Sequence, residues 1–236
     1  MQLKQQSIVI IGGSSGIGFA TAKLALAYGA DVTITGRWED KLRLAAQELG
    51  GVRTIVVDIA REPDVHQLFE ELERVDHLVV LGASLASGKI FDTPLEELGR
   101  PINERVWGAI YAIRHAIPKM SDGSITLTSG LFSSRPIAGM AVVAAALGGI
   151  EAMTRALALE LPPLRVNAIA PGYIDTPLLQ AAFEERYEQV VKAQAATLPV
   201  QRIGTASEAA TAILFLIMSG FITGSVLHLD GGGRFV

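Results

Sequence analysis

A cluster of glycines and serines near the start of the chain has the spacing of a phosphate-binding turn. It follows the apolar run 8–11 directly and reads Gly12-Gly13-Ser14-Ser15-Gly16-Ile17-Gly18. Glycines spaced in this way let the backbone turn tightly and approach a pyrophosphate, whose charge the N-terminus of the following helix stabilises. A plain glycine turn between a strand and a helix has a similar composition. The position of this segment after the first strand of a βαβ unit favours dinucleotide binding.

A basic residue follows the second apolar run. Residues 31–35 lead into Gly36 and Arg37, and no Asp or Glu occurs at positions 35 to 37. At this place a carboxylate suits the free ribose hydroxyl of NAD, whereas an arginine suits the 2′-phosphate of NADP. The sequence therefore predicts NADP(H), with a solvated loop arginine as the alternative. Asp58, which ends the third run, either holds the adenine amino group or caps the next helix.

Side chains that donate protons are missing from the middle of the chain. There is no tyrosine between positions 112 and 172, no lysine between 120 and 191, and no histidine between 116 and 227. An enzyme that reduces a carbonyl with a nicotinamide cofactor needs a positioned proton donor beside the atom that accepts hydride. The sequence thus supports cofactor binding more directly than it supports catalysis.

Short β-branched runs alternate with segments of helical spacing along the whole chain. The runs are residues 8–11, 31–35, 54–57, 77–81, 124–128, 165–169 and 225–229. This alternation predicts an α/β fold with a doubly wound parallel sheet, the Rossmann fold, covered on both faces. No linker or repeat interrupts it, so we expect a single domain over residues 1–236. The ligand of such a sheet binds at the carboxyl ends of the strands.

Composition excludes several other kinds of protein. The 236 residues are 50% hydrophobic and 19% charged, with a formal net charge of −4, which offers no basic surface for nucleic acid. The chain has no cysteine, which excludes thiol catalysis and agrees with a reducing, cytoplasmic location. The four histidines lack ligand spacing, so we expect no metal site. The longest uninterrupted uncharged apolar stretch, 137–150, is shorter than the roughly 20 residues that span a membrane, and it predicts a buried helix.

The chain resembles the short-chain dehydrogenase/reductase family over nearly its whole length. The spaced glycines, Val57-Asp58, the segment from Arg165 to Gly172 with Thr176-Pro177, Thr223-Gly224 and Asp230-Gly231-Gly232 carry the resemblance in family order. It implies a substrate lid around 178–198 and a homodimer or homotetramer with the run 137–150 at the contact. It also implies these cofactor-binding residues: Gly12, Ser14, Ser15, Gly16, Ile17, Gly18, Arg37, Asp58, Gly82, Pro171, Gly172, Ile174 and Thr176.

The chain departs from the family pattern at the positions of catalysis. Where the family has Asn, Ser, Tyr and Lys, alignment on Gly108 and on the fifth strand places Arg105, Gly130, Val143 and Leu147. Further departures are Ile11 in place of a threonine, and Val80-Leu81-Gly82-Ala83 in place of Asn-Asn-Ala-Gly. No tyrosine, lysine or histidine is available to replace the pair at any other offset within that segment.

Other groups are candidates for the missing chemistry. Arg105 could stabilise an oxyanion or bind a carboxylate or phosphate, but it does not lose its proton and cannot act as the acid. The alternative for Arg105 is that it turns outward or pairs with Glu104 or another acidic residue. Ser129 and Tyr173 border the expected cleft, as do Lys89, Ser133 and Ser134, although each is better explained as an ordinary loop residue. Two hypotheses remain: an NADP(H)-dependent oxidoreductase of a small carbonyl or alcohol with a different proton donor, or a catalytically silent NADP(H)-binding protein that acts as a redox sensor or partner subunit.

Overall fold

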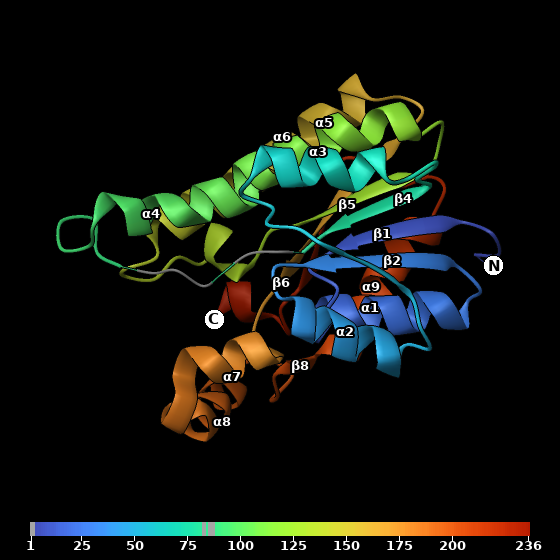
Figure 1. Cartoon of the computed structure of the whole chain (residues 1–236). Helices are drawn as coiled ribbons and strands as arrows, with labels where there is room; N and C mark the ends of the chain where they lie inside the picture. Colours follow the sequence, from blue (N-terminus) through green and yellow to red (C-terminus); the bar gives the residue numbers. More distant parts are fainter. Residues whose placement is uncertain (1–2, 82–83, 85–87) are drawn as a thin grey trace.

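Seven parallel strands form one twisted sheet at the centre of the molecule (Figure 1). The computed structural model describes residues 3–81, 84 and 88–236. The strand order is β3-β2-β1-β4-β5-β6-β9, and every neighbouring pair is parallel. The strands are β1 Ser7–Ile11, β2 Asp31–Gly36, β3 Arg53–Val56, β4 His77–Val80, β5 Ser124–Thr128, β6 Arg165–Pro171 and β9 Val226–Leu229. The predicted doubly wound Rossmann fold is confirmed.

Helices cover both faces of the sheet. One layer holds α3 Glu62–Glu70, α5 Gly108–Ala116 and α6 Ala141–Glu160, and the opposite layer holds α1 Gly16–Ala27, α2 Glu39–Glu48 and α9 Ala206–Met218 (Figure 1). Strand β1 shows why both layers are needed. Val9 and Ile11 pack into the core on the α3–α5–α6 side, whereas Ile8 and Ile10 pack into the core on the other side. A strand that is apolar on both faces has to be covered twice.

The strand order reverses between β1 and β4, which makes the carboxyl ends of these two strands the switch point of the sheet. Above β4 and β5 the chain forms α4 Leu95–Pro101 and then a π-helical turn, η1 Ile102–Trp107, before α5 begins. A π-helical turn inside a longer helix redirects side chains and is frequent at functional sites. The elements that position a ligand site therefore converge at this edge.

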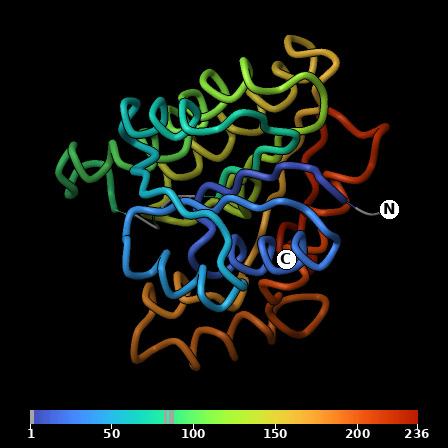
Figure 2. The backbone as a smooth tube through the Cα atoms, turned by 45° about the vertical axis from the view of Figure 1, so that its right-hand side comes forward, coloured from blue at the N-terminus to red at the C-terminus, as the bar shows by residue number. Residues whose placement is uncertain are grey.

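A small helical segment extends from the same edge of the sheet. It consists of α7 Pro177–Phe183, the short turn η4 Glu184–Arg186 and α8 Tyr187–Thr197, and it is tied to the body by the two-stranded pair β7 Ile174–Asp175 and β8 Gly204–Thr205. Figure 2 shows this orange segment on the side of the molecule that also carries α1 and α2. It coincides with the expected lid over 178–198, whose role in substrate binding remains a prediction.

Helix α6 corrects one expectation. The run 137–150 was expected to be a buried helix, but the helix begins at Ala141 and buries only one face, with Ile137, Ala141 and Ala145 exposed. Burial explains the apolar residues of the inner face only. The outer face is uncharged because small residues such as Ala141 and Ala145 occupy it. Within the described residues, α6 is the one helix that is long and apolar enough to cross a membrane by length and composition. That test is weak, because core helices pass it too.

Candidate functional site

The glycine turn after β1 is closed tightly on itself. Gly12 and Gly16 have positive φ angles of 89° and 54°, which side chains other than glycine rarely adopt. A β-carbon built on Gly18 would lie 2.0 Å from the carbonyl oxygen of Gly12, so only glycine fits at the first turn of α1. Ser15 is the N-cap of α1, and its side chain accepts no hydrogen bond from this helix. The first amide groups of α1 are therefore free of a side-chain cap and can bind an anion.

The segment after β6 comes back to the glycine turn. The side chain of Thr176 packs against Gly16: its Cγ2 would lie 3.2 Å from a β-carbon built on Gly16. Thr176 is also the N-cap of α7, where its hydroxyl accepts a hydrogen bond from the amide of Leu179. Ile174 is buried in β7, and the amide of Gly172 donates to the carbonyl oxygen of Leu229. The structure thus brings the two predicted cofactor segments together.

Two polar residues in the most distinctive motif hold the fold instead of a ligand. The guanidinium of Arg165 donates to the carbonyl oxygens of Leu216, Ile217 and Ser219, and so caps the C-terminus of α9. Asn167 is fully buried in β6, and its side-chain amide bonds to the loop between α9 and β9. Its Nδ2 donates to the carbonyl oxygen of Ile222, and its Oδ1 accepts from the backbone amide of Ser225. These bonds fix the strand end from which Pro171 and Gly172 continue.

Asp58 does not cap helix α3, because the N-cap of that helix is Arg61. Its carboxylate accepts a hydrogen bond of 3.0 Å from the amide of Ala60, and its own amide donates to Asp64. The capping alternative is therefore wrong, and the adenine alternative stays a prediction. Gly82, another predicted cofactor residue, lies outside the described residues.

Arg37 reaches across the crevice and meets a carboxylate. Its Nη1 lies 3.3 Å from Oε1 of Glu104, a side chain that is only 5% exposed, whereas the Arg37 side chain is 45% exposed. The second oxygen of Glu104 accepts a hydrogen bond of 2.5 Å from the amide of Ser84. Arg37 follows β2 and Glu104 belongs to η1, so the pair connects two elements that flank the end of β1. Arg37 is half exposed on the loop after β2, so its role at a 2′-phosphate and the solvated-loop alternative both stay predictions.

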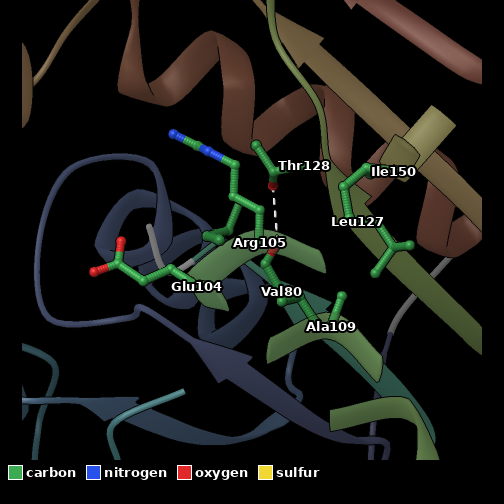
Figure 3. Close-up of a pocket in the computed structure, with 8 residues that line it drawn as sticks. Val80, Glu104, Arg105, Ala109, Leu127, Thr128 and Ile150 are labelled. Atoms are coloured by element: carbon green, nitrogen blue, oxygen red, sulfur yellow. Dashed lines mark hydrogen bonds between the residues drawn. The ribbon is translucent and has the colours of Figure 1, made fainter. Parts of the chain in front are cut away.

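Arg105 is partly buried beside Glu104 and lines a small cavity with Val80, Thr128 and other residues (Figure 3). The guanidinium donates to the carbonyl oxygen of Ser84 over 2.9 Å, and its Nε has no partner among the described residues. Burial lowers the pKa of Arg105, and the nearby Glu104 opposes this shift. The cavity measures about 10 Å³, which is just enough for one water molecule, so a substrate does not fit there without movement.

The other three aligned positions are apolar and closely packed. Val143 and Leu147 lie one turn apart on α6 and are 2% and 3% exposed. A β-carbon built on Gly130 would lie 3.4 Å from Cδ1 of Leu147 and 3.6 Å from the carbonyl oxygen of Pro171. Val143, Leu147 and Gly130 form an apolar wall beside the carboxyl ends of β5 and β6, and none of the three carries a group that can transfer a proton.

A polar cluster lies one helical turn beyond this wall. The carboxylate of Glu151 on α6 accepts hydrogen bonds from Ser129 over 2.7 Å and from Ser133 over 2.5 Å. Ser129 is buried, and its hydroxyl also lies 3.3 Å from the carbonyl oxygen of Leu147. The hydroxyl of Ser129 is therefore committed to Glu151. Sequence reasoning missed this role of Glu151, and its unusual charge inside an apolar helix was the available signal.

Tyr173 follows the Pro171-Gly172 turn and is partly buried. Burial raises the pKa of its phenol, while Arg135 acts in the opposite direction. A raised pKa keeps the proton on the phenol at neutral pH, but it makes Tyr173 a weaker acid than a tyrosine beside a lysine.

Comparisons with known proteins agree with this geometry. The family model described as Enoyl-(Acyl carrier protein) reductase matches residues 12–233. The 3-oxoacyl-(acyl-carrier-protein) reductase of Rattus norvegicus is 33% identical over 232 residues, with 94% of this chain and 95% of that protein covered. Its counterpart from Homo sapiens is 32% identical over 233 residues, with the same coverage. The chain belongs to the short-chain dehydrogenase/reductase family.

Solved structures of the family superpose closely on this one. A small-chain dehydrogenase in complex with NADPH has a TM-score of 0.86 at 32% identity, and 99% of this chain and 100% of that chain are covered. A short chain oxidoreductase from Pseudomonas aeruginosa PAO1, described as containing an atypical catalytic center, has a TM-score of 0.91 at 28% identity, with 98% of each chain covered. Members of the short-chain dehydrogenase/reductase family are oxidoreductases that bind NAD(P)(H), and the glycine turn here has the form that this binding requires.

Proposed function

We propose that this short-chain dehydrogenase/reductase binds NADP(H) and transfers hydride to or from a small carbonyl or alcohol without the family's Tyr and Lys pair. The observation that carries the proposal is the closed glycine turn, where a β-carbon on Gly18 would meet the carbonyl oxygen of Gly12 at 2.0 Å. Such a turn presents free helix amides to a pyrophosphate. Thr176, whose side chain contacts Gly16 from the segment after β6, supports the same pose.

Arg37 supports NADP(H) over NAD(H). It stands at the end of β2, where the ribose of a bound dinucleotide is recognised, and it is the basic residue that a 2′-phosphate requires. One charge-assisted hydrogen bond contributes about 1.5–3 kcal/mol, which corresponds to a preference of roughly tenfold or more. The ion pair of Arg37 with Glu104 acts against this preference, because Glu104 competes with the 2′-phosphate for the guanidinium.

The proposed enzyme lacks the catalytic tetrad of the family. Arg105, Gly130, Val143 and Leu147 stand at the positions of Asn, Ser, Tyr and Lys. Loss of a general acid lowers a rate by about 10²- to 10⁴-fold, and loss of an oxyanion donor by about 10²- to 10³-fold. Arg105 supplies a partly buried positive charge for the developing oxyanion, and Tyr173 is the candidate phenol. Water or the substrate itself provides the proton if Tyr173 does not.

A screen of NADPH oxidation tests turnover. The substrates are small aldehydes and ketones together with 3-oxoacyl thioesters, the class named by the curated relatives. The proposal predicts slow but measurable oxidation that depends on the carbonyl compound and weakens in Arg105→Lys. Tyr173→Phe weakens it further if the phenol is the donor. Oxidation at the rate of the buffer alone for every substrate would reject turnover.

A catalytically silent NADP(H)-binding protein is the second candidate. The buried apolar side chains of Val143 and Leu147 favour it, because they offer no proton donor. In that case NADPH binds with ordinary affinity, yet no carbonyl compound is reduced. The protein then serves as a sensor of the NADP(H) redox state or as a partner subunit. Calorimetric binding of NADPH combined with a negative substrate screen would select this function.

We also propose that copies of the chain form a homodimer or homotetramer. The outer face of α6 exposes small residues at Ala141, Ala145, Ala152 and Ala156, and such a face permits another helix to approach closely. A large apolar face on a free monomer is unusual. Light scattering at micromolar concentration tests the proposal, and the mass of one chain, 25.0 kDa, would reject it.

A further inference from the structure

A buried carboxylate forms an ion pair with Arg37, the arginine of the proposed NADP(H) site. Glu104 is 5% exposed in its side chain, and a buried charge requires partners. Its partners are the guanidinium of Arg37 at 3.3 Å and the amide of Ser84 at 2.5 Å. Arg105, its neighbour in η1, donates to the carbonyl oxygen of the same Ser84 over 2.9 Å. Two consecutive residues of η1 therefore bind the backbone N–H and C=O of one residue, Ser84, and Glu104 offers its remaining oxygen to Arg37.

The ion pair lies across the place where a dinucleotide enters. Arg37 follows β2, and η1 lies over the carboxyl ends of β4 and β5, where Glu104 and Arg105 line the same cavity as Val80 and Thr128 (Figure 3). Strand β1, which carries the glycine turn, lies between β2 and β4 in the sheet. The bridge from Arg37 to Glu104 thus passes over the carboxyl end of β1. That end is the crevice in which doubly wound sheets bind nucleotides.

We infer that Glu104 is a specificity-determining residue that restrains NADP(H) binding by competing with the 2′-phosphate for Arg37. This inference rests on the proposed dinucleotide site. A 2′-phosphate that takes Arg37 leaves the buried Glu104 without its cation and adds a second negative group nearby. NAD(H) has a neutral hydroxyl at that position and makes no such demand. Glu104 therefore reduces the preference for NADP(H) that Arg37 alone would give.

The half-exposed Arg37 is the mobile member of the pair. Its side chain is 45% exposed and bonds to Glu104 through one nitrogen, and its other donors make no hydrogen bond to the residues that the structure describes, so they can turn toward a phosphate. Glu104 cannot follow, because its second oxygen is bound to Ser84 inside the protein. Release of Arg37 is consequently the step on which NADP(H) binding depends.

Calorimetry on four proteins tests the inference: wild type, Glu104→Gln, Arg37→Ala and the double variant. The ligands are NADPH and NADH, together with their adenosine fragments 2′,5′-ADP and AMP. Glutamine keeps the shape of Glu104 and its acceptor for Ser84 but removes the charge. We expect Glu104→Gln to bind NADPH and 2′,5′-ADP at least about tenfold more tightly, the size of one modest charged contact, with NADH and AMP changed less than about twofold. The gain should disappear in the Arg37→Ala background.

Two further variants control the comparison. Glu96→Gln removes an exposed carboxylate from α4 and should leave all four affinities unchanged. Glu104→Asp keeps the buried charge but withdraws it from Arg37 by one methylene, and should give a smaller gain in the same direction. Melting curves establish that each variant is folded, and Glu104→Asp provides the reading if Glu104→Gln is unstable.

Failure of the inference is distinguishable from failure of the proposed function. If the wild type binds NADPH and Glu104→Gln leaves the ratio of NADPH to NADH affinity unchanged, Glu104 does not restrain the cofactor and the proposed function stands. A gain that persists without Arg37 equally overturns the competition. If neither nucleotide binds to any of the variants, the proposed dinucleotide site is wrong and the inference falls with it.

Discussion

The carbonyl oxygen of Gly12 occupies the space into which a side chain on Gly18 would project. A β-carbon built on Gly18 would lie 2.0 Å from that oxygen and 3.0 Å from the Cα of Gly13. Carbon and oxygen atoms that are not bonded stay more than 3 Å apart, so the turn and the first turn of α1 have to separate if Gly18 is replaced. The free amides that would bind a pyrophosphate belong to this turn.

Gly18→Ala should therefore strongly weaken cofactor binding while leaving most of the fold intact. The overlap is with backbone, which cannot rotate away, and overpacking of this kind destabilises a protein by about 1–3 kcal/mol. Calorimetry should show NADPH affinity lowered at least about tenfold. Gly220→Ala is the matched control, because nothing lies within 4 Å of its added methyl group. Wild-type affinity in Gly18→Ala would separate the glycine turn from the cofactor site.

Arg37→Ala should remove the discrimination between the two nucleotides. NADPH loses a charge-assisted contact worth about 1.5–3 kcal/mol, whereas NADH loses none, so their affinities should become equal within about twofold. Calorimetric titration of both nucleotides measures the ratio. Arg43→Ala, at an exposed position on α2, provides a control for the loss of one positive charge. An unchanged ratio would mean that Arg37 does not contact the 2′-phosphate.

His77 should make the protein less stable in mild acid. Burial lowers its pKa from 6.5 to about 4, with Arg165 acting in the same direction and Asp76 and Asp122 opposing it. The unfolded chain therefore binds more protons than the folded chain between these values, so stability is full above about pH 6.5 and falls as the pH drops toward 4. The shift corresponds to roughly 3 kcal/mol at 1.36 kcal/mol per pH unit.

Urea unfolding at pH 7.5, 6 and 4.5 measures this loss. His77→Gln should flatten the dependence between pH 6.5 and 4, although it also changes the contacts of the ring with Ser124 and Gln6. His66→Gln, at an exposed position, should retain the wild-type dependence. If His77→Gln and wild type lose stability in parallel, another group carries the acid sensitivity.

Asn167→Ala should destabilise the fold without touching a ligand. The side chain is fully buried, and its removal leaves the carbonyl oxygen of Ile222 and the amide of Ser225 without their partner. Each unsatisfied buried group costs about 1–3 kcal/mol, so we expect a total loss of about 2–5 kcal/mol in urea unfolding. Thr223→Ala is a milder comparison, because it removes a single bond to the amide of Val166. A loss below about 1 kcal/mol would show that water replaces the amide.

Restoring the family's side chains should raise carbonyl reduction. The variant combines Arg105→Asn, Gly130→Ser, Val143→Tyr and Leu147→Lys, and the general acid alone should add two or more orders of magnitude. Gly130 has room for a serine, but Val143 and Leu147 are buried, so the helix has to adjust to larger and charged side chains.

A matched control separates the acid from its bulk. The same quadruple change with Val143→Phe in place of Val143→Tyr has the ring but no phenol, and it should remain near the wild-type rate. Both variants need to melt cooperatively and bind NADPH before their rates are compared. Equal rates in the tyrosine and phenylalanine versions would show that the site does not merely lack a proton donor but is arranged around different groups.

The fold followed from local patterns in the sequence. Short β-branched runs predicted all seven strands of the main sheet to within two residues at either end, because β-branched residues favour strands and Gly, Asp or Pro bounds the runs. The differences have physical causes. Strand β6 continues beyond the predicted 169 to Pro171, since pairing with β9 continues through Leu229. The glycine turn was predictable for a similar reason, because the conformation of a few adjacent residues determines it.

The ion pair of Arg37 with Glu104 and the cluster of Glu151 with two serines were not predictable in this way. Glu104 lies far from Arg37 in the sequence, and the π-helical turn η1 determines where its side chain points. Nothing in the pattern of charges distinguishes a buried glutamate from the exposed ones on α4. Glu151 was visible only as a charge in an apolar helix, and its serine partners come from the turn after β5.

Calorimetric titration of the wild-type protein with NADPH tests the central claim most directly. The account predicts one binding site per chain, affinity that is strongly weakened in Gly18→Ala, and a gain in NADPH affinity when Glu104 is changed to glutamine. No heat of binding from a folded wild-type protein, with none recovered in Glu104→Gln, would contradict it.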